Sequence, residues 1–226
     1  KTQLAELWKK GPILIDLRHS PVFREALIER YQSEYLGILI SAPDMDLEAM
    51  ADHLRSIITV QQDGKPSIFR FYDPRAVGAL FEVLESSQHQ QMLGGSSKWM
   101  WHHHRQWWQF ASSQQSDSFD PPRTLSITSE QIRQVDDTRF RQFAQFMAQA
   151  YGEHIPSKDA QGFALNELSA ARSAGLSSQV DFERWLRMAI KVKGPLMESD
   201  PWQHLAGNSG RSPLQILSQL ECEQGR

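Results

Sequence analysis

The segment from Phe69 to Arg75 converts an apolar strand into a helix at one residue, and this junction constrains the fold more than any other feature. Asp73 is of a type that caps helix N-termini. Pro74 suits the first helical position, where an N–H would have no partner and where φ is already preset. Apolar residues then follow at positions i, i+3, i+4 and i+7, namely Val77, Leu80, Phe81 and Leu84. The pattern predicts a helix that buries one stripe against the sheet.

Two arginines of this junction are not explained by helix entry. Arg70 and Arg75 flank the cap formed by Asp73 and Pro74, and the four residues form one structural motif. In one interpretation the guanidinium groups bind carboxylates and unpaired carbonyl groups inside the fold. In the other they line a surface for a partner or ligand. The sequence leaves both open.

Upstream of the junction, two segments are typical of strands followed by helices. Gly11–Leu17 predicts a short buried strand, and the next helix begins at Pro21. Tyr35–Ser41 is continuously apolar, which is typical of a strand covered on both faces, and Asp44 or Asp46 caps the helix behind it. We expect parallel pairing of such strands, because helices connect them.

A hairpin is predicted around Asp63-Gly64, which separates the strands Ile57–Gln62 and Ser67–Tyr72. Further on, Trp99–Phe110 holds four tryptophans and three histidines, and we interpret it as a strand pair that ends the sheet. Antiparallel and parallel pairs together give a mixed sheet. The predicted fold class is therefore α/β, with a mixed sheet and flanking helices.

The rest of the chain predicts helices only. Ser112–Pro122 is polar and ends in two prolines, so we expect an exposed linker, followed by a last short strand at Leu125–Ile127. Helices are then predicted from Ser129 or Thr128 to Gly152, from Phe163 to Ala174, and from Asp181, Asp200 and Ser212 onward. We expect two domains, an α/β lobe over residues 1–125 and an all-helical C-terminal lobe over residues 126–226.

The composition excludes several classes of partner. The 226 residues include 24 basic and 27 acidic side chains, for a net charge of −3, and both signs occur in both lobes. Nucleic acid and anionic membrane surfaces attract proteins with a positive field, which this chain lacks. No apolar run approaches the roughly 20 residues of a membrane helix. We therefore expect no nucleic acid and no membrane among its partners.

The two ends of the chain carry further information. Cys222 is the one cysteine, so no internal disulfide and no thiolate zinc site can form, which favours a reducing cytoplasm. The chain begins at Lys1 with no signal-peptide pattern. Because it does not begin with methionine, we expect a fragment or a processed form without its true N-terminal segment.

The sequence contains none of the common catalytic motifs. A glycine-rich phosphate loop, a Gly-x-Ser-x-Gly, a His-Glu-x-x-His and a dinucleotide fingerprint are all missing. We therefore expect no enzyme, no cofactor and no metal. One alternative remains, because His102 and His104 would share a face of a strand and bind a metal through two imidazoles. A third ligand is missing locally, and the other interpretation is an exposed aromatic sheet edge or partner surface.

Several blocks together resemble the type VI secretion effector chaperone and adaptor family, known as Tap or TEC proteins. Only the block Arg70–Arg75 is highly specific. The remaining blocks extend over nearly the whole chain, and they are Leu4-x-x-Leu7 before Gly11-Pro12, the apolar strand ending at Ser41, His53-Leu54-Arg55, Asp63-Gly64, Phe182–Trp185, and Gly194-Pro195 before Asp200-Pro201. Family members carry a further stretch before the Gly-Pro strand, which is absent here.

The resemblance implies a non-enzymatic cytoplasmic protein of a Gram-negative bacterium. Such a protein binds one type VI secretion effector and loads it onto the VgrG spike. By similarity the α/β lobe defines the family, and the helical lobe recognises the effector. Two rival functions stay open, a metal-dependent hydrolase that uses the His102 and His104 region and an immunity-type protein that only neutralises a toxin.

Aromatic and apolar side chains are the expected anchors of such contacts. We expect Trp185, Trp202 and Leu214 to contact the effector, and Arg75, Trp107 and Trp108 to form a second surface. The other interpretation of Trp185 and Trp202 is that they fill the core, as large aromatics at helical spacing usually do.

Overall fold

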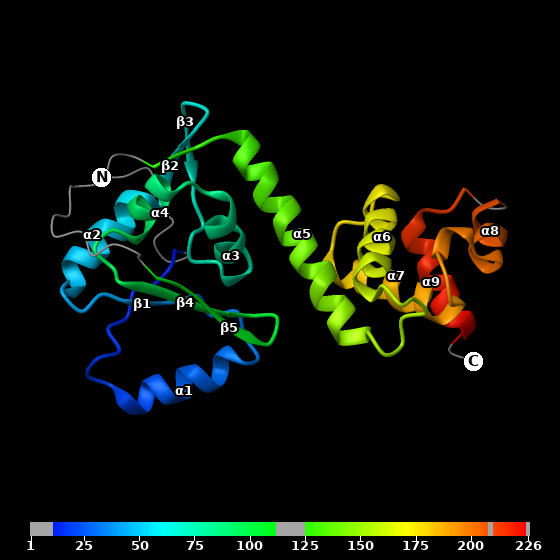
Figure 1. Ribbon diagram of the computed structural model, residues 1–226, viewed down its shortest axis with the longest axis horizontal. Coiled ribbons are helices and arrows are strands. Elements are labelled where there is room, and N and C mark those ends of the chain that lie inside the picture. The colour runs from blue at the N-terminus through cyan, green and yellow to red at the C-terminus, as the bar shows by residue number, and fades with distance from the viewer. Residues whose placement is uncertain (1–10, 112–124, 208–209, 225–226) are drawn as a thin grey trace. The chain divides into compact units, whose positions relative to one another are not determined.

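The computed structural model describes residues 11–111, 125–207 and 210–224 (Figure 1). The chain divides into two compact units, Lys1–Arg139 and Phe140–Arg226. The first combines helices with two small sheets and the described part of the second is helical, so the predicted α/β fold with a helical C-terminal region is confirmed. The boundary between the units lies inside one long helix, α5 (Ser129–Tyr151).

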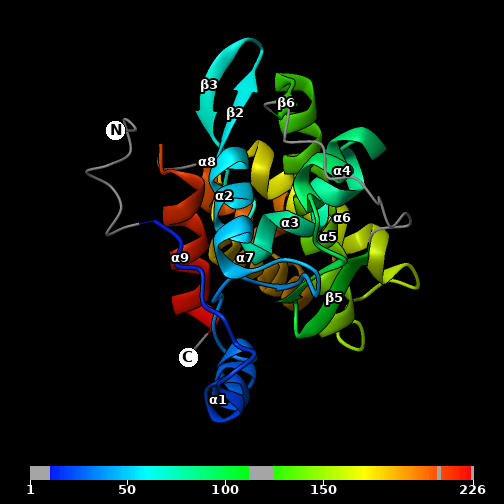
Figure 2. The same ribbon diagram turned by 90° about the vertical axis from the view of Figure 1, so that its left-hand side faces the viewer.

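The first unit contains these elements in chain order: α1 (Pro21–Tyr31), β1 (Ile38–Ser41), α2 (Leu47–Ile57), β2 (Thr59–Gln62), β3 (Lys65–Ile68), α3 (Pro74–Val83), α4 (Ser86–Leu93), β4 (Lys98–His103), β5 (Gln106–Ala111), β6 (Ser126–Ile127) and the start of α5. Figure 1 shows the β1–β4–β5 sheet between α1 on one side and α3 on the other. Figure 2 shows the β2–β3 hairpin at one end of this unit and α1 at the other.

The expected single mixed sheet is wrong, because the strands form two separate sheets. One has the order β1-β4-β5 and is antiparallel throughout, and the other has the order β3-β2-β6 with a single parallel pair, β2 with β6. β1 pairs antiparallel with β4, and its four residues are half-buried. An apolar run shows that a strand is buried but not which strand it pairs with, and here the partner lies some 60 positions further along the chain.

The segment Gly11–Leu17 contains no strand, which contradicts the sequence-based expectation. Its apolar side chains are largely exposed, with Ile13 at 85% and Ile15 at 49%. A strand needs a neighbour to pair its backbone groups, and no described strand takes this segment as a partner. The helix after it begins at Pro21 as predicted. Leu4 and Leu7 lie outside the described residues, as does the linker Ser112–Pro122.

The helix junction forms as predicted. Asp73 Oδ1 accepts a hydrogen bond from the Arg75 N–H at 3.0 Å, and Pro74 is the first residue of α3. All four residues of the predicted stripe are buried, from Val77 to Leu84. The strand before it is shorter than predicted, because β3 ends at Ile68 and the next residues form an irregular link to the helix.

Two hairpins confirm local signals in the sequence. Asp63 and Gly64 have φ angles of 47° and 79°, so they form the two-residue turn that joins β2 to β3. The strand pair predicted within Trp99–Phe110 is the β4–β5 hairpin. The short strand predicted at Leu125–Ile127 is β6, and α2 has its N-cap at Asp46, whose side chain accepts from Ala49 N at 2.7 Å.

Aromatic side chains fill the core of the first unit. Phe81 of α3 stacks on Phe110 of β5 with ring centroids 4.1 Å apart, and Trp99 of β4 lies edge-on to Phe81 at 5.7 Å. Trp99 is fully buried, and its indole N–H donates to Ser96 Oγ at 2.8 Å. One face of the β4–β5 hairpin therefore belongs to the core.

The second unit contains the end of α5 and these elements: α6 (Ala160–Ser173), α7 (Gln179–Val192), the 3₁₀ turn η2 (Leu196–Glu198), α8 (Asp200–Gly207) and α9 (Pro213–Gln224). α7 starts before the predicted Asp181, because Ser178 is the N-cap and its hydroxyl accepts from Asp181 N at 3.1 Å. No helix among the described residues is both long enough and apolar enough to span a membrane.

Candidate protein-binding surface

Arg75 forms the centre of a polar corner at the start of α3. Its Nε and Nη2 donate to the two carboxylate oxygens of Asp73 at 2.9 and 2.8 Å, so the pair is bidentate. The guanidinium also lies 5.7 Å from the centre of the Tyr35 ring. The Arg75 carbonyl accepts from Arg139 Nε of α5 at 3.1 Å. This corner therefore ties three segments of the first unit together.

The two arginines of the motif differ in their surroundings. Arg75 follows the first interpretation, since it binds a carboxylate within the fold, although its side chain stays 46% exposed. Arg70 is exposed, and no ion-pair partner for it occurs in the part of the chain that the structure describes. Contact of these arginines with a partner stays a prediction.

Histidines continue the corner toward the β4–β5 hairpin. The ring of His103 lies 5.7 Å from that of Tyr35 and stacks on His104 at 3.7 Å. His103 is 8% exposed, and its Nε2 has no hydrogen-bond partner. Burial lowers the pKa of His103 to about 3, with smaller contributions from Arg139 and from His104 in its protonated form, and burial lowers the pKa of His104 to about 4. Both rings are therefore neutral at physiological pH.

A buried neutral histidine makes stability depend on pH. Below pH 6.5 the unfolded chain protonates at His103 while the folded chain does not, so stability falls as pH decreases from 6.5 toward 3. Each such proton contributes a slope of about 1.4 kcal/mol per pH unit. We expect the stability of His103→Gln to depend less steeply on pH, by the contribution of about one proton. Urea unfolding at pH 7, 6, 5 and 4 measures this slope. Equal slopes in both proteins would contradict the assigned burial.

Trp107 and Trp108 lie on opposite faces of β5, because neighbouring residues of a strand alternate. Trp107 pairs across the hairpin with His102 and contacts Tyr31 of α1 at 5.3 Å. Trp108 pairs with the buried Trp101 on the α3 face, and its indole N–H donates to the His103 carbonyl at 3.2 Å. Both indoles stay exposed, at 43% and 49%. The expected second surface is thus a strand with one tryptophan on each side.

The geometry assumed for a metal site is wrong. β4 ends at His103, and His104 lies in the turn with φ 51°, so His102 and His104 do not share a strand face. No cluster of three or more histidine, cysteine or acidic side chains with metal-binding geometry occurs within residues 11–111, 125–207 and 210–224.

The three side chains expected to contact an effector have different positions. Trp185 and Trp202 are in the core of the second unit, at 0% and 4% exposure, with ring centroids 4.7 Å apart. The alternative interpretation therefore describes their position, and neither presents a surface to a partner in this conformation. Leu214, in the first turn of α9, is 42% exposed. Its contact with an effector stays a prediction.

The residues of the block Phe182–Trp185 make contacts within the second unit. Phe182 is buried, and Glu183 accepts from the Tyr151 hydroxyl at 2.6 Å. Arg184 binds Glu221 of α9 through Nη2 at 2.7 Å. Trp185 donates to the buried Glu167 at 3.1 Å. Glu167 is not among the residues predicted from the sequence, and its helical position among apolar residues was the available signal.

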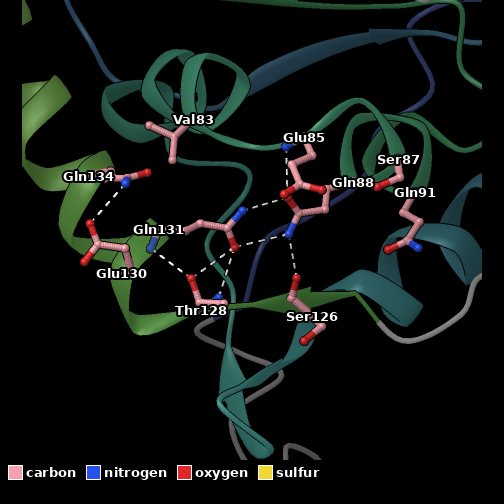
Figure 3. A pocket seen from close by; sticks show the side chains of 10 residues that line it. All are labelled: Val83, Glu85, Ser87, Gln88, Gln91, Ser126, Thr128, Glu130, Gln131 and Gln134. Carbon is pink, nitrogen blue, oxygen red and sulfur yellow. Dashed lines mark hydrogen bonds between the residues drawn. The ribbon is translucent and has the colours of Figure 1, made fainter.

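A polar pocket of about 630 Å³ lies between α4, β6 and the start of α5 (Figure 3). Gln131 Nε2 donates to Gln88 Oε1 at 2.8 Å, and Gln88 Nε2 donates to the Ser126 carbonyl at 2.6 Å. Thr128 N donates to Gln131 Oε1 at 3.0 Å. The lining contains no histidine, cysteine, lysine or arginine. Its central glutamines bind each other and the backbone, so this network joins three elements.

Residues 1–91 match the model of a family described as a domain of unknown function, DUF4123. The match contains the Asp73–Arg75 corner and ends within α4, before the β4–β5 hairpin. No curated protein and no solved structure matches the chain. The match covers less than half of the chain, lies within the first unit and names no activity.

Proposed function

We propose that this chain is a non-enzymatic cytoplasmic adaptor that binds a type VI secretion effector and loads it onto the VgrG spike. The proposal depends on the resemblance to the Tap or TEC family. Its main support is that the most specific block, Arg70–Arg75, lies within the DUF4123 match and forms a folded corner. There the charged pair stabilises helix entry and presents Tyr35 beside the guanidinium. Such a corner suits a scaffold for contact surfaces.

Two further features support binding rather than chemistry. The polar pocket between α4, β6 and α5 uses its glutamines to join elements, and it has no nucleophile paired with a base. Exposed large apolar side chains, by contrast, occur in both units, among them Tyr35, Trp107, Trp108 and Leu214. Such side chains are the usual anchors of protein interfaces.

The test is co-purification of the full chain with an effector and a spike protein encoded in the same bacterium. An adaptor gives a ternary complex that contains all three proteins. Inhibition of the toxin without spike binding would instead establish an immunity-type protein. Hydrolysis that depends on added metal would establish the hydrolase.

Assignment of the effector to the second unit is tested with point variants of the full chain. We expect Leu214→Glu to weaken effector binding about tenfold, because it puts a charge into an apolar contact. Spike binding should stay unchanged. Val180→Glu is the matched control, since Val180 is a 68% exposed apolar residue of the same unit that is not an expected anchor. Equal binding by wild type and Leu214→Glu, measured by calorimetry, would contradict this assignment.

A further inference from the structure

β5 is an edge strand whose outer side has no strand partner among the described residues. In the sheet order β1-β4-β5 it pairs only with β4. It is six residues long, and all of its residues except Phe110 are exposed. The backbone groups on the open side of such a strand are a template for another chain.

The hairpin turn determines which backbone groups point outward. His104 and Arg105, with φ angles of 51° and 61°, form a two-residue turn, so the flanking pair His103 and Gln106 is hydrogen-bonded. Pairs along an antiparallel ladder alternate between hydrogen-bonded and non-hydrogen-bonded. The N–H and C=O groups of Trp107, Gln109 and Ala111 therefore point away from β4, toward the open side.

The other sheet edges of this unit are protected. β3 carries Lys65 and Pro66, and a proline and a lysine are common devices against edge pairing. β6 is two residues long, and the four residues of β1 are half-buried. β5 has no proline and no charged residue. Among the described strands of the first unit, β5 is therefore the long edge strand that lacks features against edge pairing.

The side chains beside this edge favour an added strand. Trp107 extends over one face and Trp108 over the other, each about half exposed. An incoming strand directs alternate side chains to the two faces, so each tryptophan has a row of side chains to contact. Hydrogen bonds between the two backbones supply affinity, and the aromatic contacts supply specificity.

The charge of Arg105 distinguishes between possible partners of the β5 edge. Arg105, at the turn end of β5, is exposed and has no ion-pair partner within the described ranges. A second copy of β5 has no acidic residue to offer, because its sequence is Gln-Trp-Trp-Gln-Phe-Ala. A different polypeptide with an aspartate or glutamate opposite Arg105 complements both the backbone and the charge.

We infer that the open edge of β5 binds an extended segment of another polypeptide as a fourth strand. In this segment every second residue is apolar over about five positions. The segment contains no proline and carries an acidic residue next to Arg105. The inference concerns the binding mode. It depends on the proposed function only for the identity of the partner, which is then the protein that contacts the first unit.

The test uses a phage-displayed library of random linear dodecapeptides selected on the purified full chain. We expect enriched peptides with alternating apolar residues and an acidic residue at one end. Gln109→Pro removes one outward N–H and should weaken a selected synthetic peptide at least about tenfold, whereas Gln109→Thr, which keeps the N–H, should not. Equal binding to both variants, or no enrichment, would overturn the inference whether or not an effector binds.

A second variant keeps the result interpretable if Gln109→Pro does not fold. Arg105→Glu leaves the backbone intact and should weaken the acidic peptide about threefold to tenfold, and a lysine in place of its acidic residue should restore binding. No rescue by the lysine peptide would overturn the assigned contact between Arg105 and the acidic residue. Light scattering of the free chain checks the other occupant, since a dimer that Gln109→Pro dissociates would show that a second copy covers the edge and would overturn the inference.

Discussion

Glu167→Ala is expected to destabilise the second unit by about 3 kcal/mol, because it leaves two buried N–H groups without an acceptor. Glu167 is 4% exposed, and its Oε2 accepts from Trp185 Nε1 at 3.1 Å and from the Leu196 backbone N–H at 3.2 Å. One carboxylate thus joins α6 to α7 and to η2. For a unit of this size the loss corresponds to a decrease in Tm of roughly 10–20 °C.

Glu167→Gln separates the hydrogen bonds from the charge. Burial raises the pKa of Glu167, and the nearby Glu198 charge adds to this, although the two N–H donors lower it. Because the folded pKa lies above the unfolded one, wild-type stability falls as pH rises through the interval between them and is then constant. The glutamine variant keeps an acceptor and lacks this loss. It should be as stable as wild type or more stable at pH 7.

Calorimetric unfolding of the full chain at pH 4 and pH 7 measures both effects. Glu198→Ala is the control, since Glu198 is exposed and its removal should change stability by less than about 0.5 kcal/mol. If Glu167→Ala were as stable as Glu167→Gln, the two hydrogen bonds would not contribute to the unit, and its three elements would be held by apolar packing alone.

Local signals in the sequence predicted the elements of this fold well. The caps at Asp46 and Asp73 and the turn at Asp63-Gly64 are as expected, because each depends on the chemistry of three or four consecutive residues. The pairing of β1 with β4 was not predictable in this way. Strand pairing depends on contacts between distant segments, and an apolar run such as Gly11–Leu17 becomes a strand only where a neighbour exists.

The structure shows the positions of the expected surface residues, and their contact with a partner stays a prediction. Arg75, Trp107 and Trp108 are on the first unit and exposed, although the alternation of strand side chains places the two tryptophans on opposite faces. Trp185 and Trp202 are buried, as their helical spacing indicated, because apolar residues at i, i+3 and i+4 form the inner face of a helix. The direction of the backbone groups of β5 was not predictable from the sequence, because it depends on the register of the hairpin.

Gly94→Ala is expected to destabilise the first unit by about 3 kcal/mol or more, through two separate effects. Gly94 ends α4 with φ 55° and ψ −129°, a combination that side chains strongly disfavour. A Cβ there would lie 2.5 Å from Cε1 of His53, which is 3% exposed and bound through Nε2 to the Met92 carbonyl at 2.8 Å. The ring therefore has little room to move away.

Gly64→Ala separates the two effects. Gly64 also has a positive φ, 79°, but a Cβ there would meet no atom within 4 Å, so the substitution adds strain without a clash and should cost about 1 kcal/mol. The clash itself is measured by a double-mutant cycle with His53→Ala, in which the two changes together should cost at least about 1 kcal/mol less than their sum. Urea unfolding gives all four free energies. Additive effects would show that His53 does not contact the alanine methyl group at position 94, because two side chains that do not touch do not couple. The cost of Gly94→Ala would then come from its backbone conformation alone.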